Sequence, residues 1–373
     1  MNSKVLVDSE AFKIRFEEVA SQAKKSIYVQ AMSFEGDSSG EWLIDCLIKS
    51  NAPDIKLCLD SYSKFVINDH FVLSLKYFRD REFREEIINT KRLIKKAKEH
   101  GIGVKYTNPL GFLFLKYPLR NHKKMVVVDD EIAYLGGINF CDHNFEWHDM
   151  MIELQDSSLG SALSNDVQET FSGFNQSVKC NSGNSSIYFL DGLRSKSLYD
   201  DIFRNIKNAK KSIRLFSPYV SDPLLKFVRE NVDSSVELDI ISPAINNKSI
   251  FKKILLNELK DGYFTFMEYQ ERMSHLKAII IDDSILIAGS SNFDFVSYFF
   301  EQEVVLVSEN EGLIKEFIEK VEKPDIKNSL PLGVSEGKVD LTLVTLFQWI
   351  GKLSHFVAWC IVKGRILRKK YKK

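Results

Sequence analysis

Apolar residues recur at helical spacing and then gather into short continuous runs, and this succession occurs twice along the chain. Residues 15–31 predict a helix that leads into a strand, and residues 203–219 predict the same, with the pentapeptide AKKSI identical in both. Each copy continues through a polar loop, a second helix and a short apolar strand. Because strands that alternate with helices form α/β units, we expect two copies of an α/β unit with a largely parallel or mixed sheet.

The length of 373 residues suits two domains of ordinary size. We place the first lobe at residues 1–179 and the second at 187–325, separated by a polar, glycine-containing stretch at 180–186. A Pro/Gly/Ser-containing linker is expected at 326–338. A helix with a basic tail is expected at 339–373.

The first copy is the longer one. AKKSI repeats at an offset of 186 residues, whereas the histidines of the motif described below repeat at 153, so the first copy holds about 33 additional residues. We place this insertion, which is rich in aromatic residues, at about 61–90.

Composition narrows the class of protein. The 44% hydrophobic and 27% charged fractions exclude a disordered chain and a multispan membrane protein. Lys+Arg and Asp+Glu balance at 51 each, but residues 363–373 hold seven basic residues and no acidic one, which leaves residues 1–362 with a net charge of −7. The five cysteines are far apart and form no CxxC pair, which favours a reducing compartment over a disulfide framework or a zinc site. No apolar signal segment opens the sequence.

One spaced motif occurs once in each copy. Both occurrences read HxKxxxxD, followed after six residues by G-[GS]-x-N. A histidine and a lysine two positions apart on a strand point to the same face, and the apolar runs MVVV and AIII that follow are typical of buried strands. The motif residues of the first copy are His122, Lys124, Asp129 and Asn139. Those of the second copy are His275, Lys277, Asp282, Ser290 and Asn292.

Two histidine–lysine pairs suit phosphodiester chemistry. One histidine can act as nucleophile and the other as general acid, while the lysines stabilise phosphoryl charge. Because the lysines neutralise that charge, we expect neither a metal nor a cofactor.

The duplicated motif resembles the phospholipase D superfamily over roughly residues 10–325, and its flanks are similar to the bacterial cardiolipin synthases. RNHKK (120–124) resembles their RNHRK, GGINFCD (136–142) their GGxNxxD, and WHD (147–149) their W-R-D. GSSNFD (289–294), with Ser297 and Glu303, resembles their GSxNxDxRSxxxNxE. The chain departs from that pattern at Val296 and Glu301, which stand where the family has Arg and Asn.

The resemblance implies two similar α/β lobes, each a mixed sheet flanked by helices, related by pseudo-twofold symmetry around a single active site. It implies a ping-pong mechanism through a phosphohistidine, with His122 as nucleophile and His275 as the acid. It implies that Asp149 and Glu303 orient the imidazoles. It implies that Asp129 and Asp282 close each motif by hydrogen bonds. The residues that it implies in binding phosphate or substrate are Lys124, Lys277, Asn139, Asn292 and Ser290.

Two features suggest a lipid substrate. The aromatic insertion and GFLFLKYPL (111–119) could form an acyl-chain groove or part of the core, and the sequence leaves both open. Residues 339–362 are apolar except for a stripe of Thr345, Gln348, Lys352 and His355. Because Lys352 and His355 would be costly in hydrocarbon, we expect an in-plane amphipathic helix rather than a spanning anchor or a docked helix.

We therefore predict a phosphatidyltransferase that makes cardiolipin from phosphatidylglycerol at the cytoplasmic side of the cell membrane. A hydrolytic phospholipase D is the first alternative. A metal-independent nuclease is disfavoured by the acidic body, and no nucleic-acid partner is expected. A lipid-binding scaffold is disfavoured by the two intact motifs. The oligomeric state, the lipid headgroup and the acceptor stay open.

Overall fold

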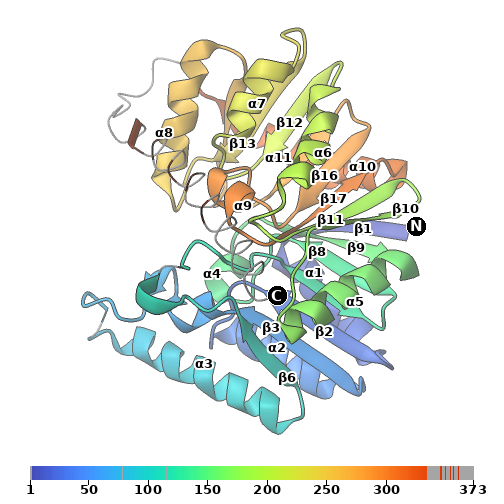
Figure 1. Ribbon diagram of the computed structural model, residues 1–373, viewed down its shortest axis with the longest axis vertical. Coiled ribbons are helices and arrows are strands. Elements are labelled where there is room, and N and C mark those ends of the chain that lie inside the picture. The colour runs from blue at the N-terminus through green and yellow to red at the C-terminus, as the bar shows by residue number, and fades with distance from the viewer. Residues whose placement is uncertain are drawn as a thin grey trace, which may run out of the picture. The chain divides into compact units, whose positions relative to one another are not determined.

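The structure is a computed structural model that describes residues 2–77, 79–114 and 116–333, together with 345, 346, 349, 353, 356 and 360. The chain divides into two compact units, each with its own sheet (Figure 1). The first unit comprises Met1–Asn175 and Cys180–Ile187, and the second comprises Gln176–Lys179 and Tyr188–Lys373.

A seven-stranded mixed sheet forms the centre of the first unit, in the order β1-β9-β8-β7-β2-β3-β6. β2 pairs in parallel with β3, and β3 with β6, whereas β7, β8, β9 and β1 extend the sheet in antiparallel fashion. The strands are β1 (Asn2–Val7), β2 (Ser26–Ala31), β3 (Asp54–Asp60), β6 (Gly103–Thr107), β7 (Met125–Val128), β8 (Ile132–Gly136) and β9 (Met150–Gln155).

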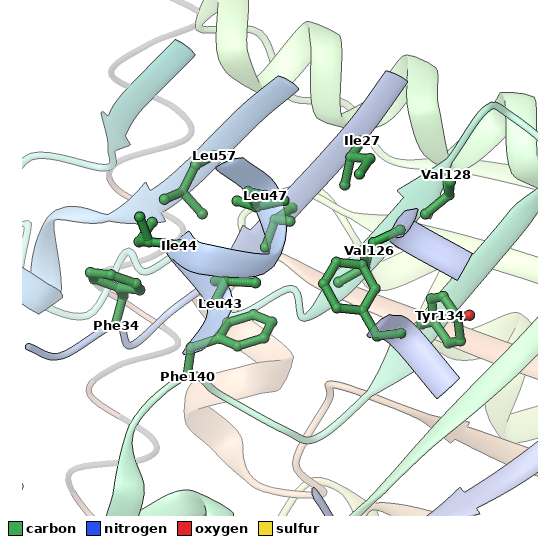
Figure 2. Close-up of a cluster of buried hydrophobic side chains, with 14 of the residues drawn as sticks. Ile27, Phe34, Leu43, Ile44, Leu47, Leu57, Val126, Val128, Tyr134 and Phe140 are labelled. Carbon is green, nitrogen blue, oxygen red and sulfur yellow. The ribbon is translucent and has the colours of Figure 1, made fainter. Parts of the chain in front are cut away.

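Helices cover this sheet on both faces. The helices of the unit are α1 (Asp8–Ser21), α2 (Ser38–Lys49), α3 (Arg81–Glu99), α4 (Asp142–Phe145) and α5 (Ser157–Ser172). Leu43 of α2 shares one buried cluster with Val126 and Val128 of β7 (Figure 2). Phe16 of α1 belongs to the same cluster. α5 contacts the same strands, and its Asp166 pairs with Lys123, whose side chain must point to the opposite face from Val126.

The second unit is built around a nine-stranded sheet in the order β10-β11-β17-β16-β15-β12-β13-β14-β18. Its strands are β10 (Val178–Ser182), β11 (Ser185–Leu190), β12 (Ser212–Phe216), β13 (Glu237–Pro243), β14 (Thr265–Tyr269), β15 (Ala278–Ile281), β16 (Ile285–Gly289), β17 (Glu303–Ser308) and β18 (Ser329–Pro331). Its helical segments are α6 (Lys196–Lys207), α7 (Leu224–Asn231), α8 (Ser249–Glu258), η3 (Leu259–Asp261), α9 (Phe295–Phe299), α10 (Glu311–Phe317), η4 (Ile318–Glu322) and α11 (Lys323–Lys327).

The two sheets repeat one topology. In the second unit, β12 pairs in parallel with β13 and antiparallel with β15, as β2 does with β3 and β7 in the first. The strand carrying the motif then turns back through β16 as β7 does through β8. The predicted α/β class, with two sheets flanked by helices, is confirmed.

Three segments refine the sequence-based boundaries. The polar stretch at 180–186 contains the turn of the β10–β11 hairpin, at Gly183. Near the start of the linker expected at 326–338, the structure has a strand instead: Ser329–Pro331 form β18, which pairs with β14. Of the predicted C-terminal helix, the described positions 345, 346, 349, 353, 356 and 360 are helical and exposed, and the rest of that prediction lies outside the described residues. No helix within the described residues is long and apolar enough to cross a membrane.

The insertion forms a small substructure between β3 and α3. It contains η1 (Ser61–Lys64) and the hairpin of β4 (Val66–Ile67) and β5 (His70–Phe71), and the segment before β7 adds η2 (Phe112–Phe114). Phe65, Phe71 and Phe114 pack their rings together, with centroids 5.6–6.4 Å apart. Leu75 and Phe112 are 91% and 81% exposed, so neither belongs to the core, which was one of the two interpretations left open.

Candidate active site

The first motif places its histidine and lysine in the segment that enters β7. His122 is 6% exposed and Lys124 is fully buried, and the Lys124 ammonium donates to the carbonyl oxygen of His122 at 2.9 Å. A buried ammonium is costly unless it is hydrogen-bonded, and the carbonyl oxygen of His122 supplies one partner for it. Lys123 points away and forms its own buried ion pair with Asp166 on α5, at 2.6 Å.

A buried ion pair holds the backbone immediately before His122. The carboxylate of Asp60, at the end of β3, accepts from Arg120 at 2.7 Å and from the backbone N–H of Asn121 at 2.5 Å. The Asn121 side chain in turn accepts from Gln30 on β2 at 2.9 Å. Burial raises the pKa of Asp60 to about 7, although Arg120 and the backbone donors favour its charged form. This network fixes the position of His122, and sequence reasoning missed Asp60 because it lies 60 residues before Arg120 outside any motif.

The second unit repeats the histidine–lysine arrangement at the entry to β15. His275 and Lys277 are both buried, and the Lys277 ammonium donates to the carbonyl oxygen of His275 at 2.5 Å. The ring of Tyr219 packs edge-on against the His275 imidazole, with centroids 6.0 Å apart. Each unit therefore carries one buried imidazole and one buried ammonium with the same local geometry.

The aspartates that close the motifs are bound by the backbone of the neighbouring strand. Asp129 accepts from the N–H groups of Lys24, Lys25 and Ser26 at 2.8, 2.7 and 2.9 Å. These donors belong to the first AKKSI pentapeptide. Partial burial alone would raise the pKa of Asp129, but the three donors outweigh it and the pKa is lowered.

Asp282 repeats this contact in the second unit. It accepts from Lys210, Lys211 and Ser212 at 2.8, 2.7 and 2.9 Å, and its pKa is lowered for the same reason. The repeated pentapeptide and the repeated aspartate are therefore two halves of one contact, and both aspartates act on the structure of the motif.

The second residue of each G-[GS]-x-N motif, Gly137 or Ser290, lies against the acidic residue predicted to orient the imidazole of its unit. In the first unit, a Cβ on Gly137 would lie 2.2 Å from an oxygen of the Asp149 carboxylate, so only glycine admits this approach. In the second unit, the hydroxyl of Ser290 donates to Glu303. Glu303 also accepts from Ser297 at 2.8 Å and is fully buried. The chain thus uses close packing in one unit and a hydrogen bond in the other to hold an acidic side chain.

The two motif asparagines are buried but differently engaged. Asn139 accepts from the N–H of Ser33 at 3.2 Å and donates to Asn144 at 2.9 Å, which fixes the plane of its amide. The side-chain carbonyl oxygen of Asn292 is buried without a hydrogen-bond partner in the described part of the chain. A buried amide with unused bonding capacity is a candidate ligand contact.

Two residues near the motifs that differ from the family pattern have hydrogen-bond partners. His148 stands where the family pattern has Arg, and its Nδ1 lies 2.8 Å from the carboxylate of Asp8 at the start of α1. Glu301 stands where the pattern has Asn, and it accepts from Ser297 at 3.0 Å. His148 and Glu301 are therefore both part of hydrogen-bonded networks within their own units.

Comparison with known proteins gives the family. A family model described as the phospholipase D-like domain of cardiolipin synthase matches residues 17–173 and 202–324. The chain belongs to this family. The match includes both histidine–lysine motifs, and it confirms the assignment to the phospholipase D superfamily as a phosphatidyltransferase of the cardiolipin synthase-like type.

Curated relatives agree at modest identity. Minor cardiolipin synthase ClsB of Bacillus subtilis (strain 168) is 27% identical over 290 residues, which cover 72% of this chain and 72% of that protein. Cardiolipin synthase A of Buchnera aphidicola subsp. Acyrthosiphon pisum (strain APS) is 25% identical over 232 residues, which cover 54% of this chain and 47% of that protein. The match thus spans about half the length of the second relative.

Among solved structures, phosphatidylserine synthase of Haemophilus influenzae Rd KW20 superposes with a TM-score of 0.70. The superposition covers 95% of this chain and 94% of that one at 14% sequence identity. A polyphosphate kinase from Porphyromonas gingivalis superposes with a TM-score of 0.59 over 94% of this chain and 53% of its own, at 11% identity. At these identities the likeness concerns the fold alone.

Proposed function

We propose that this protein makes cardiolipin by transferring a phosphatidyl group from one phosphatidylglycerol molecule to another, through a phosphohistidine on His122. The observation that carries the proposal is the duplicated buried pair of imidazole and ammonium, His122 with Lys124 and His275 with Lys277, in a chain of the cardiolipin synthase family. The two pairs act on one phosphate in this proposal.

In the first step, an imidazole nitrogen of His122 attacks the phosphorus of phosphatidylglycerol. The phosphorus–oxygen bond to the glycerol headgroup breaks, and His275 gives its proton to the leaving oxygen. In the second step, a hydroxyl of another phosphatidylglycerol loses its proton to His275 and attacks phosphorus. The phosphorus–nitrogen bond then breaks and regenerates His122. Lys124 and Lys277 stabilise the charge on the phosphoryl oxygens.

Exposed apolar side chains support a lipid substrate. Leu73, Leu75 and Phe112 protrude beside the aromatic cluster of Phe65, Phe71 and Phe114. In the C-terminal segment, Leu346, Trp349, Leu353 and Phe356 are each more than half exposed, and their spacing of three and four residues puts them on one helical face. Such surfaces suit contact with a bilayer, and we propose peripheral attachment to the cytoplasmic side of the membrane.

The test is to supply phosphatidylglycerol vesicles to the purified full chain and to measure cardiolipin and free glycerol. Wild-type protein is expected to form both in equal amounts. His122→Ala is expected to lose at least about 10³-fold in rate because it removes the nucleophile. His100→Ala serves as the control, because His100 lies at the exposed C-terminal end of α3. Absence of both products with wild-type protein would refute the proposal.

The same assay separates transfer from hydrolysis. Phosphatidic acid in place of cardiolipin would show that water reaches the phosphohistidine, which is the phospholipase D alternative. Glu301, which replaces an asparagine of the family pattern beside Ser297, is the observation that favours testing for it. Mass spectrometry of the quenched reaction is expected to find the phosphatidyl adduct on the peptide that contains His122.

A further inference from the structure

Four potential metal ligands from three separate segments of the first unit lie close together. Glu35 lies in the loop between β2 and α2, Glu86 lies on α3, and Cys141 and His143 flank the start of α4. One ligand atom each of Glu35, Cys141 and His143 lies within 4.8 Å of the others, and Glu35 and Glu86 approach within the same limit. No local spacing in the sequence indicates this group.

Glu35 is buried and Glu86 is partly buried, and each has one buried oxygen atom that is not hydrogen-bonded to any residue that the structure describes. Glu35 is 2% exposed, and its Oε1 accepts from the N–H of Asn68 at 3.1 Å. Its Oε2 has no hydrogen-bond partner within the described residues, and the same is true of Glu86 Oε1 and His143 Nδ1. Neither carboxylate forms an ion pair with a lysine or an arginine in the part of the chain that the structure describes. Buried oxygens of this kind require a cation or a proton.

The donor set and its spacing suit zinc. One thiol, one imidazole and carboxylate oxygens are the ligands that Zn²⁺ takes in proteins. A tetrahedral ion with bonds of about 2.0–2.3 Å places neighbouring ligand atoms roughly 3.3–3.6 Å apart. His143 Nδ1 lies 3.6 Å from Glu35 Oε2, and one ligand atom each of Glu35, Cys141 and His143 lies within 4.8 Å of the other two.

Asp37 is the other acidic residue within reach of Glu35, but it is already engaged. Its carboxylate accepts from the N–H groups of Gly40 at 2.9 Å and Asp142 at 2.5 Å, where it caps α2. Glu86 keeps one oxygen bonded to the Asn68 side chain at 3.0 Å and has the other available. Glu86 does not lie within 4.8 Å of the Glu35, Cys141 and His143 ligand atoms together, so it supplies negative charge beside the ion rather than a fourth bond.

We propose that Glu35, Cys141 and His143 bind one Zn²⁺ ion, which fastens the aromatic insertion to the turn that follows the first motif. The ion would join Glu35, which accepts a hydrogen bond from Asn68 of the insertion, to the turn that carries Asn139, two residues before Cys141. Binding would release the proton of the Cys141 thiol, because a coordinating cysteine is a thiolate. The role is structural, and it is separate from the chemistry assigned to the histidine–lysine pairs.

The competing state is a proton shared by the two carboxyl groups. Burial, followed by the neighbouring carboxyl group of Glu86, raises the pKa of Glu35 to about 10, so a metal-free cluster would hold a proton at neutral pH. Metal content distinguishes the two states directly.

The experiment measures metal in the purified full chain, after exposure to a chelator and re-addition of Zn²⁺, by non-denaturing mass spectrometry. We expect one ion per chain, lost in Cys141→Ser and in Glu35→Gln. Cys58→Ser is the matched control, because Cys58 is also buried in this unit, its thiol donates to the carbonyl oxygen of Val167 at 4.0 Å, and it belongs to no group of potential metal ligands among the described residues. With Co²⁺, the wild type and Cys58→Ser should show sulfur-to-cobalt charge-transfer absorption that Cys141→Ser lacks.

Two outcomes would overturn the proposal: a wild-type chain that binds no ion, or binding that survives both Cys141→Ser and Glu35→Gln. Should Cys141→Ser fail to fold, His143→Gln tests the same site at a partly exposed side chain. A second readout is proteolysis within residues 61–90, which Zn²⁺ should slow in the wild type and not in Glu35→Gln. Neither measurement uses lipid, so its failure leaves the proposed phosphatidyl transfer unaffected.

Discussion

Replacing Asp129 with asparagine should destabilise the first unit, because its carboxylate organises three consecutive backbone N–H groups. Oδ1 accepts from Lys25 and Ser26, and Oδ2 accepts from Lys24. An asparagine keeps one oxygen and sets an N–H₂ group against the third donor. Asp129 has φ 55°, a region that asparagine tolerates as aspartate does, so the substitution adds no backbone strain.

The magnitude follows from the bonds lost. A hydrogen bond to a charged group contributes about 1.5–3 kcal/mol, and a neutral one about 1 kcal/mol. Losing one charged bond and weakening two, with allowance for the solvent exposure of Lys24 and Lys25, gives a cost of about 2 kcal/mol. For a unit of this size, that lowers the melting temperature by about 4–8 °C.

The assay is differential scanning calorimetry of wild-type, Asp129→Asn and Asp130→Asn proteins. Asp130 is the matched control, because it is the next residue, has φ 61° and undergoes the same change of charge. The pKa of Asp129 is lower in the folded state than in the unfolded chain. Its contribution is therefore present above about pH 4 and is lost as the pH falls through the folded-state value. Equal melting temperatures for the two variants at pH 7, or a difference that persists at strongly acidic pH, would refute this account.

Three further expectations concern other parts of the molecule. Gly137→Ala should unfold or inactivate the protein, since its Cβ would lie 2.2 Å from the Asp149 carboxylate, whereas Gly333→Ala, in open space, should have no effect on calorimetry or activity. Asp60→Asn should cost about 3–5 kcal/mol in urea unfolding at pH 8, because it leaves Arg120 buried without its carboxylate partner; a cost below 1 kcal/mol would contradict this. Leu75→Glu should weaken co-sedimentation with phosphatidylglycerol vesicles without changing the melting temperature. Undiminished binding would show that the insertion does not contact the membrane.

The helices, the strands and the duplication could be predicted from the sequence because each is encoded locally. The helix-to-strand pattern around AKKSI and the apolar runs after each HxK depend only on residues close together in the chain. Contacts between segments distant in the chain were not predictable. Asp60 and Arg120, Lys123 and Asp166, and Glu35 with Cys141 meet only because the sheet order brings their strands and loops together. The sequence predicts a linker where Ser329–Pro331 form a strand, because the pairing of that strand with β14 is equally non-local.

The repeated pentapeptide matters because of where it acts. Its backbone N–H groups receive the motif aspartate, and the backbone N–H of that aspartate donates to Ser26 in one unit and Ser212 in the other, at 2.9 Å. These contacts fix the register at the far end of the β2–β7 and β12–β15 pairs. A one-residue slip would turn every side chain to the opposite face of the sheet. The register therefore decides which side chains face the core under α1, α2 and α3: His122 and Lys124 as observed, or Lys123 after a slip. The aspartate of HxKxxxxD therefore acts on the histidine at a distance, by setting which side of the sheet carries the imidazole.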